Sequence, residues 1–279
     1  MPELPEVETI RLQLNKILPG KTVQSVIINN PKSFVGKSSI VTGRKIVRVR
    51  RFAKVLVIDL DLDVSLAIHL KMTGQLLYRA SPNKHTRVVL TFSDGDRLYF
   101  NDQRKFGWMR VLRNATMQQF SNVPMIESII NNLGPDALNE LTVNQLENIL
   151  KTSKRPIKLL LMDQAKIGGV GNIYANEALF LSRIDPKLQS GKVSKRQSIL
   201  LFKNLQKVLK DGIKWKGASR NHFRDIYGKK GMVQEHFSVY DREGNICVNK
   251  CGGKIMRFVL GGRSTFYCPN CQNKQFLIQ

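Results

Sequence analysis

The sequence has few acidic side chains for its size, and this scarcity gives the first indication of a partner. Only 21 Asp and Glu residues stand against 45 Lys and Arg in 279 residues, so the formal net charge at pH 7 is +24. An excess of this kind favours a polyanionic partner, because each phosphate that Lys or Arg neutralises releases condensed counterions. We expect nucleic acid, with an anionic membrane surface as the main alternative.

Long apolar runs and a recognisable export signal are also missing. No apolar stretch approaches the ~20 residues that span a bilayer, and the N-terminus is acidic where a signal peptide carries basic residues. All four cysteines lie between positions 247 and 271, so no disulfide framework is spread along the chain. We find no internal repeat and no low-complexity tract. These absences predict a cytoplasmic globular protein.

The hydrophobic pattern divides the chain into parts. Residues 5–18 carry apolar side chains at helical spacing, and Pro19-Gly20 ends that helix. Residues 22–115 form short β-branched runs, which predict an antiparallel sandwich or barrel with the helix against it. A Gly-Pro break near 133 opens a helical pattern. We therefore expect an α+β protein with a sandwich domain at 1–132, a helical domain at 133–216, a loop at 217–239 and a small C-terminal module at 240–279.

The C-terminal module carries a metal-binding pattern. Its cysteines have the spacing C-x3-C, sixteen residues, then C-x2-C, which suits a tetrahedral zinc site; they are Cys247, Cys251, Cys268 and Cys271. The intervening KIMRFVLGGRSTFY predicts two strands around a Gly-Gly turn, as in a zinc ribbon. Zinc would stabilise a module too small to fold on its own core. Arg263, just past the turn, is either solvated or a phosphate contact.

Three other segments could contact DNA. IKLLLMDQAKIGGVGNIYANEALF predicts two helices joined by a glycine turn, with Asn172 as N-cap of the second; such a helix start can hold a phosphate, although helix packing without a ligand explains the pattern equally well. NDQRKFG and HLKMTG place Arg104, Phe106 and Met72 in turns between strands. These side chains belong either to the core or to a surface that enters a duplex where a base has been extruded.

The opening MPELPEVE offers a nucleophile. If Met1 is removed, Pro2 becomes a secondary amine, and an α-amino group titrates near ~7.7–8.0 against ~10.4 for a lysine side chain. The C1′ atom of a damaged nucleotide is a suitable electrophile. Glu3 and Glu6 could move protons if they lie close to the amine. Alternatively, Glu6 and Glu8 are simply acids of the first helical turn, which the helix dipole favours, and this is our interpretation of Glu8.

Together these segments resemble the formamidopyrimidine-DNA glycosylase family, bifunctional enzymes that remove oxidised purines. The resemblance covers nearly the whole chain and rests on MPELPEVETI, RRFAKVLVIDL, HLKMTG, NDQRKFG, LGP, KLLLMDQAKIGGVGNIYANEALF and GGRSTFYCPNCQ. It implies an N-terminal β-sandwich with a flanking helix, a helix-two-turn-helix domain and a β-hairpin zinc finger with one structural Zn²⁺. It also implies a monomer that acts on double-stranded DNA with oxidised bases or abasic sites, associated with the bacterial nucleoid.

The same resemblance implies individual roles. Pro2 would be the Schiff-base nucleophile and Glu3 the proton donor, while Lys54 and Arg263 would contact phosphate and assist the β- and δ-eliminations. Contacts to the DNA backbone would come from His69, His85, Lys154, Lys158 and Asn172. The gap left by the flipped nucleotide would be filled by Met72, Arg104 and Phe106, with Arg104 facing the orphaned base. Residues 217–236 correspond to the lesion-recognition loop.

Three departures and two rival functions accompany this resemblance. The first cysteine pair has three intervening residues where the family usually has two, Asp241 stands where glycine is usual, and the 217–236 loop is divergent and basic. One rival is the sister branch that excises oxidised pyrimidines, which normally opens PEGPE; Leu4, Lys158 and the RKF turn argue against it. The other is a non-catalytic DNA-binding zinc protein, which has no need of Pro2 and Glu3.

Overall fold

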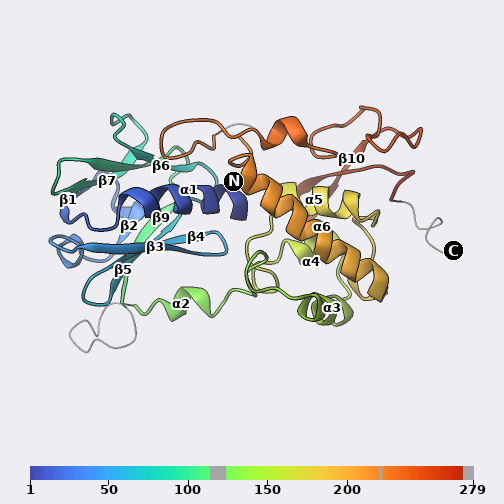
Figure 1. Ribbon diagram of the computed structural model, residues 1–279, viewed down its shortest axis with the longest axis horizontal. Coiled ribbons are helices and arrows are strands. Elements are labelled where there is room, and N and C mark those ends of the chain that lie inside the picture. Colours follow the sequence, from blue (N-terminus) through green and yellow to red (C-terminus); the bar gives the residue numbers. More distant parts are fainter. Residues whose placement is uncertain (114–123, 220–221, 273–279) are drawn as a thin grey trace. The chain divides into compact units, whose positions relative to one another are not determined.

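The computed structural model describes residues 1–113, 124–219 and 222–272 (Figure 1). The chain forms two compact units. The first comprises Met1–Asn132 and Gly212–Gln234, and the second comprises Leu133–Asp211 and Glu235–Gln279. Among the described residues, no helix is both long enough and apolar enough to cross a membrane.

The first unit is a β-sandwich with helix α1 (Leu4–Ile17) packed on β3 (Figure 1). One sheet has the order β2-β9-β5-β4-β3 and the other β1-β7-β8-β6, and every pairing is antiparallel except β2 with β9. The strands are β1 (Val23–Ile28), β2 (Phe34–Val35), β3 (Ile46–Phe52), β4 (Val55–Leu60), β5 (Val64–His69), β6 (Gly74–Tyr78), β7 (Thr86–Phe92), β8 (Arg97–Asp102) and β9 (Trp108–Arg113). The predicted sandwich with its flanking helix is confirmed.

The core of the sandwich explains why these segments fold together. Val7, Ile10 and Leu14 lie on one face of α1 and are fully buried with strand residues such as Leu56 and Phe100. Each such side chain contributes roughly 1.5–3 kcal/mol when it leaves water. Besides α1 and the strands, the described residues up to Asn132 form 3₁₀ turns at Pro31–Ser33 and Ser38–Ile40 and the short helix α2 (Glu127–Ile130).

The second unit is helical and ends in a β-hairpin (Figure 1). Its elements are α3 (Val143–Lys151), α4 (Ile157–Leu161), α5 (Asn172–Leu181), a 3₁₀ turn (Ser190–Lys192), the long helix α6 (Lys195–Lys214), a 3₁₀ turn (Val233–His236), β10 (Met256–Leu260) and β11 (Arg263–Tyr267). Leu260 pairs with Arg263 across Gly261 and Gly262, whose φ values are +57° and +71°. Two successive positive φ angles suit a type I′ turn, so the predicted Gly-Gly hairpin is confirmed.

The C-terminal hairpin and its cysteines pack on α5. Phe180 of α5 shares a buried cluster with Ile255, Phe266, Cys247 and Cys268. The chain therefore has the α+β fold that the sequence predicts, with a sandwich, a helical region and a C-terminal hairpin carrying clustered cysteines.

Candidate active site and metal centre

The strand register brings the predicted site residues of the sandwich together at one end of the strands. Val55 pairs with His69, and His69 pairs with Trp108, so the start of β4, the end of β5 and the start of β9 lie side by side. Lys54 precedes the first of these strands, the HLKMTG turn follows the second, and the RKFG turn precedes the third. In the other sheet, Gly74 pairs with Asp102 at the same two turns. Residues that are distant in the sequence thus lie at the same end of the sandwich strands.

The N-terminal acids are held by backbone amides. Pro2, Glu3 and Glu6 are all buried. The Glu3 N–H donates to Glu6 Oε2 (2.8 Å), completing a capping box at the start of α1, and the Ala218 N–H donates to Glu6 Oε1 (2.7 Å). Glu6 therefore joins the helix start to residue 218, which favours a structural role over the proton transfer considered above. Gly217 (φ +82°) is required beside it, because a Cβ there would lie 2.8 Å from Glu6 Cγ.

Lys54 lies in a two-residue turn that a buried arginine supports. Ala53 has φ +50°, and its carbonyl accepts from Arg51 Nη1 at 2.9 Å. Arg51 also donates to Glu8 Oε2 at 2.8 Å, and Glu8 is paired with Arg11 as well. The dipole interpretation of Glu8 is therefore wrong: α1 begins at Leu4, which places Glu8 in the second turn, where its partners are side chains. The Glu8–Arg51 pair connects α1 to the turn that carries Lys54.

His69 is kept neutral in the folded protein. Burial, followed by the charges of Lys71 and Lys54, lowers the pKa of His69 to about 3. Its Nδ1 accepts a hydrogen bond from the Lys71 N–H at 3.0 Å. Because Nδ1 is the acceptor, Nε2 carries the proton. The ring is thus a neutral donor that the charge of Lys54 influences, and it forms a tilted pair with Trp108, with 5.7 Å between the ring centroids.

The two predicted gap-filling turns present side chains to solvent. Phe106 is 55% exposed, and the Arg104 guanidinium lies over its ring at 4.9 Å. Arg104 itself is exposed and Met72 is half-buried. The alternative that these turns supply core residues is therefore wrong for Arg104 and Phe106. His85 is half-buried directly before β7, and its carbonyl accepts a hydrogen bond from the Asp102 N–H (2.9 Å).

In the second unit, several predicted DNA contacts converge on the hairpin. Lys158 has no exposed surface, and its Nζ donates to the Ser264 carbonyl (2.9 Å) and the Thr265 hydroxyl (2.7 Å). In this arrangement the ammonium group is buried beneath the hairpin and not available to a phosphate. Arg263, the residue before Ser264, is exposed just past the turn, and Lys154 is exposed before α4. Lys158 therefore positions the strand that carries Arg263.

Asn172 is not the N-cap that the sequence predicts. Helix α5 begins at Asn172, and its N-cap is Gly171, which has extended backbone angles. The Asn172 side chain instead donates to the Ser264 carbonyl (3.1 Å). Sequence reasoning missed Asn176, whose Oδ1 accepts from the Phe266 N–H (2.8 Å) and whose Nδ2 donates to the Asn172 carbonyl (2.6 Å). An asparagine inside a helix, where it is intrinsically unfavourable, was the available signal.

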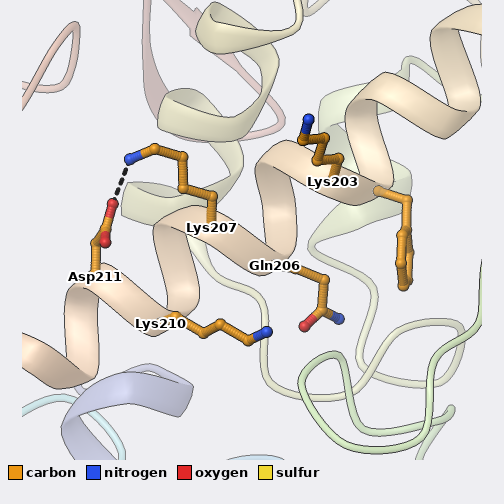
Figure 2. A pocket seen from close by; sticks show the side chains of 6 residues that line it. Lys203, Gln206, Lys207, Lys210 and Asp211 are labelled. Atoms are coloured by element: carbon orange, nitrogen blue, oxygen red, sulfur yellow. Dashed lines mark hydrogen bonds and ion pairs between the residues drawn. The ribbon is translucent and has the colours of Figure 1, made fainter.

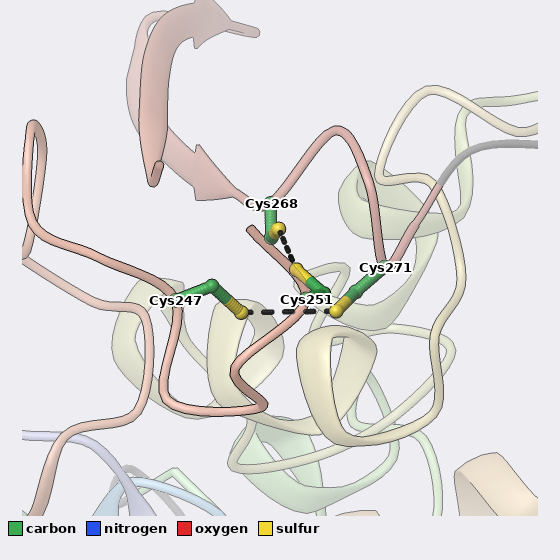
Figure 3. Close-up of side chains that lie close together, drawn as sticks. All are labelled: Cys247, Cys251, Cys268 and Cys271. Carbon is green, nitrogen blue, oxygen red and sulfur yellow. Dashed lines mark hydrogen bonds between the residues drawn. The ribbon is translucent and has the colours of Figure 1, made fainter. Parts of the chain in front are cut away.

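The four cysteines form a site that fits zinc (Figure 3). Their sulfur atoms lie within 4.8 Å of one another, with 3.7 Å between Cys247 and Cys271 and 3.5 Å between Cys251 and Cys268. Zn–S bonds of about 2.3 Å in a tetrahedron give S–S edges of about 3.8 Å. The longer first knuckle is accommodated because Lys250 adopts φ +52°. These four thiols could hold a structural zinc ion.

A buried carboxylate fixes the chain that enters the metal module. Glu177 of α5 accepts from the N–H groups of Ser238 (2.9 Å), Val239 (2.9 Å) and Tyr240 (2.8 Å). Burial raises the pKa of Glu177, and the amide hydrogen bonds oppose that rise. The next residue, Asp241, has φ +60°. A glycine is favoured in this left-handed conformation and aspartate tolerates it, which explains the departure at this position.

A surface groove of about 480 Å³ lies along α6 (Figure 2). It is lined by Phe202, Lys203, Gln206, Lys207, Lys210 and Asp211, and Lys207 pairs with Asp211. None of the residues that the sequence predicts for catalysis, DNA contact or metal binding lines it. The candidate site therefore does not coincide with this groove.

Comparisons with known proteins cover nearly the whole chain. Residues 1–109 match the formamidopyrimidine-DNA glycosylase N-terminal domain, residues 133–224 its H2TH domain, and residues 247–274 the zinc finger found in FPG and IleRS. A formamidopyrimidine-DNA glycosylase of Chloroflexus aurantiacus is 40% identical over 98% of both chains.

Solved structures agree with this match. The MutM (Fpg) protein of Thermus thermophilus has 35% identity and a TM-score of 0.86, over 97% of this chain and 98% of that one. Lactococcus lactis Fpg, solved with DNA containing an abasic site and, as a mutant, with DNA containing Fapy-dG, has 28% identity and a TM-score of 0.87 over 98% of this chain and 100% of those chains. The fold and the order of its parts are shared along the chain.

Proposed function

The chain belongs to the formamidopyrimidine-DNA glycosylase family, and from this membership we propose that it excises oxidised purines from duplex DNA and then cleaves the abasic strand. The substrates would be 8-oxoguanine and formamidopyrimidines. The observation that carries the proposal is that Pro2 and Glu3 are buried directly before α1, the helix whose Glu8–Arg51 pair holds the Lys54 turn. The L. lactis complex with Fapy-dG DNA supports the choice of a purine lesion.

The first step would be base removal. With Met1 removed, the Pro2 nitrogen attacks C1′ of the everted nucleotide, and the bond between C1′ and the base breaks with its electrons leaving on the base. Glu3 donates a proton in this step, and the proline nitrogen loses its own. The C1′–O4′ bond of the sugar ring then breaks, and O4′ takes its electrons and a proton. Because proline is a secondary amine, the ring-opened adduct is a cationic iminium, which withdraws electrons from the sugar.

Strand cleavage would follow from that cation. Loss of a proton from C2′ breaks the C3′–O bond, and a second elimination breaks the C5′–O bond, so a one-nucleoside gap remains with phosphate at both ends. Lys54 would assist the first elimination, and the exposed Arg263 would bind phosphate and assist the second. The neutral Nε2–H of His69 would add a hydrogen bond to the DNA backbone.

The remaining roles concern DNA and zinc. His85, Lys154 and Asn172 would contact the backbone, and Met72, Arg104 and Phe106 would fill the gap left by the flipped nucleotide, as their solvent-facing turns permit. One structural Zn²⁺ would bind the four cysteine thiolates and hold the hairpin bearing Arg263. Double-stranded DNA is the proposed partner of the monomer, in keeping with the net charge of +24.

Borohydride trapping tests this function. Duplexes carrying 8-oxoguanine, an oxidised pyrimidine or an abasic site are incubated with the protein and sodium borohydride, which reduces any iminium to a stable amine. We expect an adduct with 8-oxoguanine DNA that Pro2→Gly removes and Pro5→Ala retains. An adduct with the pyrimidine lesion alone would assign the chain to the sister activity, and no adduct with any duplex would leave only a DNA-binding function.

A further inference from the structure

We propose that Asp102 is a positioning residue that fixes the two gap-filling turns to each other, and that base extrusion depends on this link. The inference rests on the proposed function. Asp102 is the last residue of β8, and its side chain has no exposed surface. It precedes the turn with Arg104 and Phe106, and the turn with Met72 leads into the neighbouring strand β6, whose first residue, Gly74, pairs with Asp102.

Both oxygens of this carboxylate accept hydrogen bonds from the turns. Oδ2 accepts from the Gly107 N–H at 2.7 Å. Oδ1 accepts from the Arg104 N–H at 3.2 Å and from the Thr73 hydroxyl. One buried side chain therefore contacts both ends of the RKFG turn and the residue that follows Met72.

Thr73 closes the link between the turns. Its hydroxyl donates to Asp102 and accepts from the Arg104 N–H at 2.9 Å, so the two turns are joined directly as well as through the carboxylate. Thr73 is only 7% exposed, which protects this contact from water. Hydrogen bonds that involve a charged acceptor are stronger than neutral ones, particularly where water is excluded.

Two glycines allow the turns to close around the carboxylate. A Cβ at Gly107 would lie 2.8 Å from Phe100 Cζ and 3.1 Å from Asp102 Oδ2. A Cβ at Gly74 would lie 2.4 Å from the Leu70 carbonyl oxygen, which accepts the Gly74 N–H at 2.9 Å. The backbone is therefore closely packed on both sides of Asp102. The side chains of Met72, Arg104 and Phe106 extend from turns whose backbone is held in place.

An asparagine cannot replace this carboxylate fully. The side-chain amide of asparagine has only one accepting oxygen. Its NH₂ group would face either the Gly107 N–H or the Arg104 N–H beside Thr73, so one hydrogen-bond donor would point at another. The turn on that side would lose its support. Filling the gap of an extruded base requires side chains held in place, and a misplacement of about 1 Å can cost about a hundredfold in rate.

Two substrates separate positioning from general stability. Excision from an 8-oxoguanine duplex requires extrusion of a stacked base, whereas a preformed abasic duplex has no base to extrude at that position. We expect Asp102→Asn and Thr73→Val to slow excision by about tenfold or more while slowing cleavage of the abasic duplex by less than about threefold. Thr73→Ser keeps the hydroxyl and should keep the wild-type ratio of the two rates.

Asp59→Asn is the matched control. Asp59 of β4 is also a buried carboxylate of the sandwich, accepting from Arg50 and from the Ser65 hydroxyl, and it bonds to neither turn. Its substitution should leave the ratio unchanged. The proposal is overturned if Thr73→Val and Thr73→Ser give the same ratio, or if Asp102→Asn changes the ratio no more than Asp59→Asn. If Asp102→Asn does not fold, the Thr73 pair decides. A wild-type protein inactive on both duplexes would instead refute the proposed function.

Discussion

Acidification should destabilise the sandwich through His69. The pKa of His69 is lowered to about 3, first by burial and then by Lys71 and Lys54, whereas an unfolded histidine titrates near 6.5. Below pH 6.5 the unfolded chain therefore binds a proton that the folded chain does not. The stabilising contribution is complete above that pH and is lost as the pH falls towards 3. Between pH 7 and pH 5 the loss from this one group amounts to about 2 kcal/mol in the free energy of unfolding.

The matched variant is His69→Asn. An asparagine side chain accepts a hydrogen bond from the N–H two residues on, as the Nδ1 of His69 does from Lys71, and it does not titrate. In urea unfolding at pH 7 and pH 5, the wild-type protein should lose about 2 kcal/mol more than the variant. NMR checks the cause directly, since the chain has only four histidines and the variant identifies the ring signal. A ring that titrates near pH 6.5, or equal losses in both proteins, would refute this reasoning.

Three further outcomes follow from burial and charge. Lys154 is exposed, so Lys154→Ala should reduce the slope of the logarithm of the DNA-binding constant against the logarithm of the salt concentration by about 0.9. Lys158→Met removes a buried ammonium group, so it should leave that slope unchanged and lower the Tm of the protein. Lys54→Ala should weaken binding to damaged and undamaged duplexes alike with a shallower slope; an unchanged slope would count against its phosphate contact. Chelation should release one zinc per chain and abolish amide protection in the hairpin bearing Arg263 while the sandwich stays protected, and an unaffected hairpin would contradict a structural metal.

Local patterns in the sequence were sufficient to predict the elements. Alternating β-branched runs predicted the strands, the Gly-Gly pair predicted the hairpin turn, and the spacing of the cysteines predicted their convergence within 4.8 Å. Each of these signals depends on neighbours in the chain, such as the period of a strand or the φ angle of a turn.

Contacts between distant residues could not be predicted in this way. A lysine such as Lys158 is typical of phosphate contacts, and its burial is explained only by the hairpin 106 residues later in the chain. From the sequence, Glu8 was interpreted through the helix dipole, whereas in the structure it pairs with Arg51. The hydrogen bond between Thr73 and Asp102 likewise joins residues that are 29 positions apart. Such side chains take their roles from tertiary packing, which the hydrophobic period of the sequence does not encode.

The most direct test of the proposed chemistry is the position of the covalent bond in the reduced enzyme–DNA adduct. After borohydride trapping with 8-oxoguanine duplex, proteolysis and mass spectrometry should find the sugar remnant on the nitrogen of Pro2, in chains from which Met1 has been removed. Chains that retain Met1 should bind the duplex and form no adduct. A sugar remnant on the side chain of Lys54 or of any other lysine would contradict the account.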